Sequence, residues 1–175
     1  MDHVAPLKPS TIAIVGHSGA GKTTLIERLL PLLNASGMRV ATIKHSHHSL
    51  EFDVPGKDSW RHKQAGAAAS LLAAPSGIQL IADVVKNPYL EQLTQQYFFD
   101  MDLVLAEGFS QASCAKIEVL RKDCNPVARC TVADGLIALA TDVEAGDTPQ
   151  PRFGLNEIDS IAQFIMGWCK SGAKS

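Results

Sequence analysis

Residues 16–23 read Gly16-His17-Ser18-Gly19-Ala20-Gly21-Lys22-Thr23, which is the pattern G-x-x-x-x-G-K-[ST]. An apolar run precedes this stretch at 11–15, and apolar residues at helical spacing follow it at 24–33. Glycines in such a turn let the backbone N–H groups curl inward, and together with the helix N-terminus they form a cavity for polyphosphate. We predict a phosphate-binding loop in which Lys22 neutralises the β- and γ-phosphates and the Thr23 hydroxyl holds Mg²⁺. The alternative is a glycine-rich turn that binds nothing.

The composition is that of one globular domain. The chain has 175 residues, of which 46% are hydrophobic, and its formal net charge is −2. No run of lysine and arginine exceeds two residues, so we expect no nucleic-acid partner. Residues 1–10 lack a basic segment followed by a long apolar one, which favours a cytoplasmic location. We predict a single domain over residues 1–175.

Strand and helix patterns alternate along the chain. Strands are predicted at 11–15, 40–44, 102–106, 116–121 and 136–140, and helices at 24–37, 60–67, 87–99 and from Asn156, as N-cap, to 168. This alternation predicts an α/β fold, a P-loop NTPase three-layer sandwich with a mostly parallel sheet and a hairpin insertion. Because ligands bind such sheets at the carboxyl ends of the strands, His45, Glu107 and Asp142 should emerge at the same edge as the loop.

An uncharged stretch at 64–82 has two interpretations. Its length approaches that of a membrane span, but Pro75-Ser76-Gly77 interrupts it and favours a β-hairpin with strands at 70–74 and 78–82. We therefore predict a hairpin and no membrane segment. Since the helices of a small α/β domain already cover its sheet, we expect the apolar hairpin 70–82 to lie in a homodimer contact.

Two acids at strand ends indicate how a nucleotide is bound. Glu107, before Gly108, resembles the acid that engages Mg²⁺ directly or through water, the alternative being a solvated acid. Asp142 stands where GTP-binding proteins of this class read the base, and its carboxylate can accept bonds from guanine N1–H and N2–H₂. Adenine offers no such pair of donors, so GTP is favoured over ATP. The Asn/Thr-Lys that many GTPases carry before this Asp is missing, and a turn-forming Asp is the alternative.

The segment from Lys44 to Ser59 combines histidines, acids and lysines. A carboxylate from Asp53 or Asp58 could complete the Mg²⁺ shell. His45, His47 and His48 could serve as acid/base groups or metal ligands, or be incidental in a solvated loop, and their role stays open.

The four cysteines match no C-x-x-C metal or redox pattern. They are Cys114, Cys124, Cys130 and Cys169. We expect free, mostly packed thiols, with a zinc site as the alternative.

Six motifs occur in order along nearly the whole chain. They are Gly16-x-x-Gly19-x-Gly21-Lys22-Thr23-Thr24, Ile43-Lys44-His45-x-His47-His48, Asp53-x-Pro55-Gly56-Lys57-Asp58-Ser59, Ala65-Gly66-Ala67, Glu107-Gly108-Phe109 and Ala140-Thr141-Asp142. Together they resemble the molybdopterin-guanine dinucleotide biosynthesis adaptor family, MobB. The resemblance implies a GTP-binding homodimer with weak GTPase activity, which assists the attachment of GMP to molybdopterin on a partner guanylyltransferase.

A small-molecule kinase or ATP-dependent ligase could use the same loop. Kinases of this size usually carry a lid with clustered arginines, whereas the arginines here are scattered along the sequence. A nucleotide-free interaction module conflicts with the intact loop. We also find no well-placed glutamine and no dedicated arginine finger, so any GTP hydrolysis should be slow.

These interpretations assign three groups of site residues. The nucleotide-binding residues are Gly16, His17, Ser18, Gly19, Ala20, Gly21, Lys22, Thr23, Thr24 and Asp142. The magnesium ligands are Thr23, Asp53, Asp58 and Glu107. Lys22 and Glu107 act on the reacting phosphates, and the expected cofactors are GTP and Mg²⁺.

Overall fold

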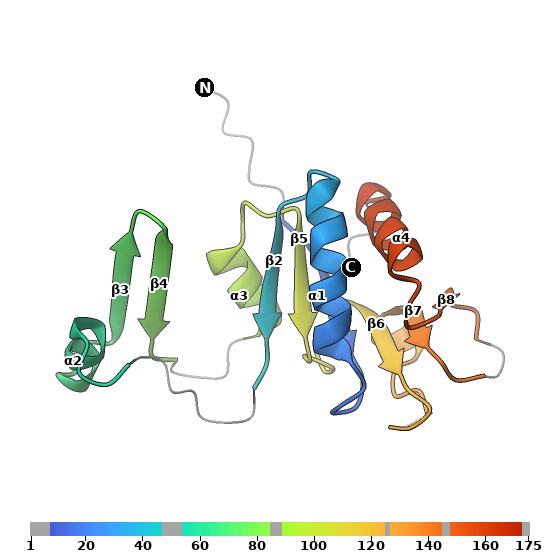
Figure 1. Cartoon of the computed structure of the whole chain (residues 1–175), viewed down its shortest axis with the longest axis horizontal. Helices are drawn as coiled ribbons and strands as arrows, with labels where there is room; N and C mark the ends of the chain where they lie inside the picture. Colours follow the sequence, from blue (N-terminus) through green and yellow to red (C-terminus); the bar gives the residue numbers. More distant parts are fainter. Residues whose placement is uncertain (1–7, 47–53, 85–88, 125–126, 145–147, 173–175) are drawn as a thin grey trace. The chain divides into compact units, whose positions relative to one another are not determined.

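A computed structural model describes residues 8–46, 54–84, 89–124, 127–144 and 148–172. The chain forms two compact units. The first consists of Met1–His45 with Tyr89–Ser175, and the second is Ser46–Pro88. The second unit contains the hairpin that the sequence predicted as an insertion (Figure 1).

The first unit is built on a six-stranded parallel sheet. Its strands, in sheet order, are β2 (Val40–Lys44), β5 (Leu103–Glu107), β1 (Ser10–Val15), β6 (Ala115–Leu120), β7 (Leu136–Thr141) and β8 (Arg152–Phe153). All neighbouring strands pair in parallel, so their carboxyl ends reach the same edge (Figure 1). This confirms that the phosphate loop and the ends of β2, β5 and β7 share one edge.

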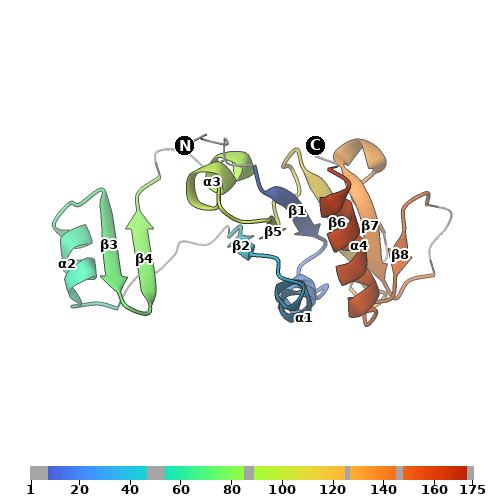
Figure 2. The ribbon, with the colours of Figure 1, turned by 90° about the horizontal axis from the view of Figure 1, so that it is seen from above.

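Helices cover both faces of this sheet, which confirms the predicted three-layer architecture. On one face α1 (Lys22–Ala35) and α4 (Ile158–Lys170) pack against each other and on strand residues such as Ile12 and Ile14. Figure 2 shows α3 (Leu90–Tyr97) on the opposite face of the sheet from α1. Its first residue, Leu90, belongs to a cluster with Ala13 and Val15. The alternation along β1 therefore supplies both cores with apolar side chains.

Two predicted helix starts were wrong. The last helix has Glu157 at its N-cap, because the Asn156 side chain is engaged elsewhere: its Oδ1 accepts a hydrogen bond of 2.8 Å from Arg28 Nη1. The helix expected from 87 begins at Leu90, with Tyr89 at its N-cap and the Gln92 side chain accepting the Tyr89 N–H at 3.2 Å. The sequence pattern also missed the short β8 and the 3-10 turn η1 (Val132–Asp134).

Two buried charged residues hold the irregular segments that cross one face of the sheet. The Glu118 side chain is fully buried and accepts hydrogen bonds from the backbone N–H groups of Arg129 and Cys130 at 2.9 and 3.0 Å. The Lys116 ammonium donates to the carbonyls of Ala112, at 2.6 Å, and Asp134. Hydrogen bonding to backbone compensates for burying these charges.

The cysteines behave as the packed thiols that the sequence predicted. Cys114 and Cys130 are buried in the cluster on the α3 side of the sheet, and desolvation raises the pKa of both thiols. Desolvation also raises the pKa of Cys169, while Cys124 is exposed. Within the described ranges, no three His, Cys, Asp or Glu side chains gather as a metal site would require.

The second unit consists of a short helix and the predicted hairpin. Helix α2 (Asp58–Gln64) precedes strands β3 (Ala69–Ala74) and β4 (Gly77–Ala82), which pair antiparallel. The hairpin prediction for the uncharged stretch is therefore confirmed. In the part of the chain that the structure describes, no helix is both long and apolar enough to cross a membrane.

Candidate functional site

The phosphate loop has a backbone that only glycine adopts readily. Gly16, Gly19 and Gly21 have φ values of 138°, 79° and 99°. In addition, a Cβ atom placed on Gly16 would collide with the Val119 carbonyl oxygen of the neighbouring strand β6. The first glycine of the motif is therefore required both for its dihedral angle and for the close approach of the two backbones.

The Lys22 side chain turns back over this loop. Its Nζ donates to the carbonyl oxygens of His17 and Gly16 at 2.7 and 3.1 Å. The first residue of α1 thus places its positive charge within the curve of the loop, where the helix N-terminus also favours anions. This is the position that the motif predicts for a phosphate-binding lysine.

Thr23 and Glu107 meet beside the loop. The Thr23 hydroxyl donates to the Glu107 carboxylate, with both oxygens at 2.9 Å, and Lys44 Nζ lies 3.1 Å from Oε1 of the same group. The Glu107 side chain is only 14% exposed. A hydroxyl and a carboxylate are hard oxygen ligands, so this pair fits Mg²⁺.

The structure leaves the other two predicted magnesium ligands, Asp53 and Asp58, untested. Asp53 lies outside the described residues, as do His47 and His48. Asp58 belongs to the second unit, where it is the first residue of α2. Its carboxylate lies 3.8 Å from the Arg61 guanidinium of the same helix. Both assignments stay predictions.

The backbone after Glu107 adopts an unusual conformation. Gly108 and Phe109 both have left-handed φ values, 87° and 54°, and the Gly108 N–H donates to the Ile14 carbonyl at 3.0 Å. The Phe109 ring packs against the His45 ring with centroids 5.1 Å apart, while the His45 N–H donates to the Glu107 carbonyl. His45 is therefore brought to the end of β5, at the edge of the sheet where the sequence predicted it.

A cleft of about 360 Å³ opens beside the loop. Its lining comes from four parts of the first unit: the loop and α1, the end of β6, the end of β7 and the turn before α4. These residues are Ala20, Gly21, Thr24, Leu25, Arg28, Val119, Arg121, Thr141, Asp142, Gly154, Leu155, Asn156 and Glu157. The cleft therefore joins the phosphate loop to the predicted base-reading Asp142.

Hydrogen bonds fix the polar wall of this cleft. Asp142 Oδ1 accepts the backbone N–H of Lys122 at 2.7 Å, and Thr141 Oγ1 accepts that of Val143 at 2.9 Å. Glu157 Oε2 accepts the Gly154 N–H at 2.8 Å. Asp142 keeps its second carboxylate oxygen for a ligand, because the described residues engage only Oδ1.

Sequence reasoning missed four polar residues of the cleft, namely Arg28, Arg121, Asn156 and Glu157. Arg28 and Asn156 bond to each other across 128 positions of the chain, and Arg121 follows the end of β6. Of these, only Arg121 carried a detectable signal, since it is the last residue of the strand predicted at 116–121, which ends at the ligand edge.

Comparisons with known proteins identify the family of the chain. The family model described as molybdopterin guanine dinucleotide synthesis protein B, MobB, matches residues 11–142. The chain belongs to the MobB family. The molybdopterin-guanine dinucleotide biosynthesis adapter protein of Haemophilus influenzae is 38% identical over 159 residues, which cover 90% of this chain and 88% of that protein. The protein of the same name from Escherichia coli is 35% identical over 164 residues, covering 90% and 91%.

Solved MobB structures share the fold. A crystal structure of molybdopterin-guanine biosynthesis protein B superposes with a TM-score of 0.73 at 30% identity and covers 91% of this chain and 99% of that one. Bacillus subtilis MobB gives a TM-score of 0.70 at 25% identity, covering 90% and 96%. The chain is thus a MobB family member with a P-loop NTPase-like fold.

The loop geometry leads to a first prediction about Lys22. Replacing it with alanine should weaken the binding of nucleoside triphosphate by roughly a hundredfold or more, because it removes the positive charge from a cradle otherwise made of backbone. Titration calorimetry measures the affinity, and a circular dichroism melt shows that the fold is kept. Lys170→Ala, in the last turn of α4, serves as the control. Wild-type affinity in Lys22→Ala would rule out the loop as a phosphate site.

Proposed function

We propose that this chain is a GTP-binding adapter that assists molybdopterin guanine dinucleotide synthesis and hydrolyses GTP slowly. The observation that carries the proposal is that the phosphate loop and Asp142 line one cleft. In this proposal the adapter works with a guanylyltransferase that joins GMP to molybdopterin. Family membership supports the pathway, and the residues of the cleft support the choice of nucleotide.

Asp142 is the proposed reader of guanine. Its Oδ1 accepts the Lys122 N–H, which holds the carboxylate against the cleft wall. The remaining acceptor capacity suits the N1–H and N2–H₂ donors of guanine, and adenine lacks this pair of donors. The preference for GTP over ATP follows from this difference.

Thr23 and Glu107 are the proposed magnesium-binding residues. Thr23 Oγ1 lies 2.9 Å from both Glu107 carboxylate oxygens, so the hydroxyl and the carboxylate are close enough together to hold one Mg²⁺. Bound Mg²⁺ neutralises the charge of the β- and γ-phosphate oxygens. Lys22 supplies the second positive charge from the loop side.

We propose slow hydrolysis because a fast GTPase needs a side chain that orients the attacking water, usually a glutamine. None of the described residues that line the cleft is a glutamine. Gln111, four residues after Glu107, is exposed, and no described contact brings its amide to Thr23 or Glu107. Without a group that orients the attacking water, the rate depends on a partner.

A small-molecule kinase or ATP-dependent ligase is the competing function. Among the described arginines, Arg39 pairs with Asp100 at 2.8 Å and Arg152 donates to the Val143 carbonyl at 2.7 Å. Among the described arginines only Arg28, from α1, and Arg121, the residue directly after β6, line the cleft. This arrangement favours binding over the closing lid of a kinase.

A homodimer through the hairpin completes the proposal. On one face of the hairpin Leu71 pairs with Leu80, beside Ile78, and these side chains are 56%, 41% and 74% exposed. The opposite face carries the buried Ile81, and α2 packs on β3. An exposed apolar face of this kind suits a second copy of the same surface.

The base-reading role of Asp142 predicts the effect of Asp142→Asn. The variant should bind GTP about tenfold more weakly or worse and gain affinity for xanthosine triphosphate, because the amide can donate to the xanthine carbonyl. The amide oxygen still accepts the Lys122 N–H, so the cleft wall is preserved. Calorimetry with GTP, ATP and xanthosine triphosphate measures the change, with Glu144→Gln, outside the cleft lining, as control. Equal affinity of the wild type for GTP and ATP would contradict the assignment.

The adapter function predicts slow turnover. Purified protein should hydrolyse GTP within one or two decades of ~10⁻⁴–10⁻² s⁻¹, the range of P-loop GTPases without an activating partner. Single-turnover phosphate release measures this rate, and Lys22→Ala reveals any contaminating activity. A rate above about 1 s⁻¹ without a partner would support a kinase-like enzyme instead.

The dimer model predicts that Leu71→Lys yields monomers or aggregates, because it places a charge in the apolar contact. Val132→Lys, which changes a comparably exposed residue of the first unit, should leave the oligomeric state unchanged. Multi-angle light scattering measures both. A wild-type protein that is monomeric at micromolar concentration contradicts the model.

A further inference from the structure

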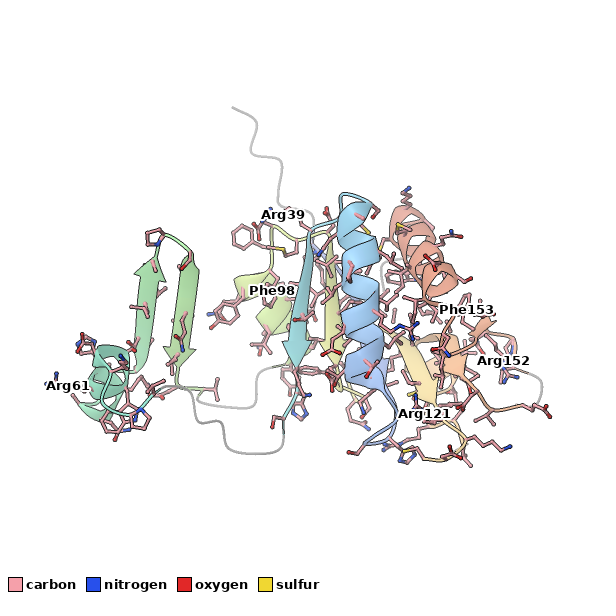
Figure 3. All side chains as sticks on the ribbon, viewed as in Figure 1. Arg39, Arg61, Phe98, Arg121, Arg152 and Phe153 are labelled. Atoms are coloured by element: carbon pink, nitrogen blue, oxygen red, sulfur yellow. The ribbon has the colours of Figure 1, made fainter. Side chains whose placement is uncertain are left out.

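Arg121 lies against the end of the phosphate loop. It directly follows β6, the neighbour of β1 in the sheet, and so leaves the sheet at the edge where the loop begins. Figure 3 labels Arg121 near the end of α1 that follows the loop. A Cβ atom placed on Gly21 would lie 3.5 Å from Arg121 Nη2 and 3.9 Å from its Cζ. The guanidinium thus borders the last loop residue before Lys22.

This guanidinium is available to a ligand. No carboxylate within residues 8–46, 54–84, 89–124, 127–144 and 148–172 forms an ion pair with Arg121. The two acids of the cleft accept backbone N–H groups, Asp142 from Lys122 and Glu157 from Gly154. The second arginine of the cleft, Arg28, is bonded to Asn156. Arg121 is therefore the cleft cation whose hydrogen-bonding groups face no described partner.

A nucleotide that spans the loop and Asp142 would pass the Arg121 side chain. With the β- and γ-phosphates in the loop at Lys22 and the base at Asp142, the α-phosphate and ribose must cross the cleft between them. Gly21, Thr24 and Arg121 line that crossing. A guanidinium presents a planar fork of donors that matches phosphate oxygens, so it suits the α-phosphate better than the uncharged ribose.

We infer that Arg121 binds the α-phosphate of the guanine nucleotide, an inference that rests on the proposed function. Together with Asp142 it grips the GMP half of GTP, which is the half that a guanine dinucleotide retains. The charge on the α-phosphate is the same before and during loss of the γ-phosphate. Arg121 therefore contributes to affinity and leaves the rate of hydrolysis at saturation unchanged, as expected for a contact made equally in the ground and transition states.

The test compares ligands that do and do not reach the crossing. Calorimetry of wild type, Arg121→Ala and Arg121→Lys uses GTP, GDP and pyrophosphate, each with Mg²⁺. We expect Arg121→Ala to weaken GTP and GDP by the same factor, about tenfold to a hundredfold, and to leave pyrophosphate unchanged. Arg121→Lys should recover part of the loss, since it keeps the charge without the fork. The kcat for GTP should stay within about twofold.

A neighbouring cation provides the matched control. Lys122→Ala removes one positive charge at the next position, outside the cleft lining, and keeps the backbone N–H that Asp142 accepts. It should bind all three ligands like the wild type. Circular dichroism melts of the variants should coincide because Arg121 is exposed.

Three results would overturn the inference: unchanged GTP affinity in Arg121→Ala, an equal loss for pyrophosphate, or a loss for GTP without one for GDP. The second would mean that Arg121 supports the loop itself, and the third that it contacts the γ-phosphate. A wild-type protein that binds no guanine nucleotide would instead overturn the proposed function on which the inference rests.

Discussion

The close approach of Gly16 to strand β6 is the constraint on which the site depends. The chain leaves β1 with a φ of 138°, and the Val119 carbonyl occupies the space where any side chain would begin. This contact fixes the start of the loop between β5 and β6. As a result the loop delivers Thr23 to Glu107 on one side and Gly21 to Arg121 on the other. The position of Gly16 thus helps to set two distances in the site, from Thr23 to Glu107 and from Gly21 to Arg121.

Strand β6 needs support from its other face to hold that position. Glu118, next to Val119 but pointing to the opposite side of the strand, ties the segment around Arg129 and Cys130 to the sheet through backbone N–H groups. The loop between β6 and this segment touches the phosphate loop again, because Cys124 Sγ donates to the Ser18 carbonyl at 3.0 Å. The loop that carries Arg121 is therefore held from the sheet and from the phosphate loop. The buried Glu118 carboxylate, which does not line the cleft, thus helps to position it.

The sequence predicted those parts of the site that follow from local pattern and strand direction. The glycine motif identified the loop, and the rule that parallel strands end at one edge brought Glu107 and Asp142 to it. Asn156 was misassigned as a helix cap because its partner, Arg28, is 128 positions away, and no local pattern reports such a contact. Arg121 was missed for a related reason. Its value depends on β6 being the neighbour of β1, and strand order is decided by packing of the whole sheet.

The loop presents mainly backbone groups to a ligand, whereas the cleft presents side chains. This difference bears on what an adapter needs. In the proposed complex the loop would hold phosphate mainly with backbone groups and Lys22, which any nucleoside triphosphate satisfies equally. The cleft would hold the base and the α-phosphate with side chains, whose contacts do not change as the γ-phosphate leaves. If the site binds guanine nucleotide as proposed, most of its selectivity lies in contacts that raise affinity without raising the rate. High affinity combined with slow hydrolysis would suit a protein that keeps GTP available for a partner enzyme.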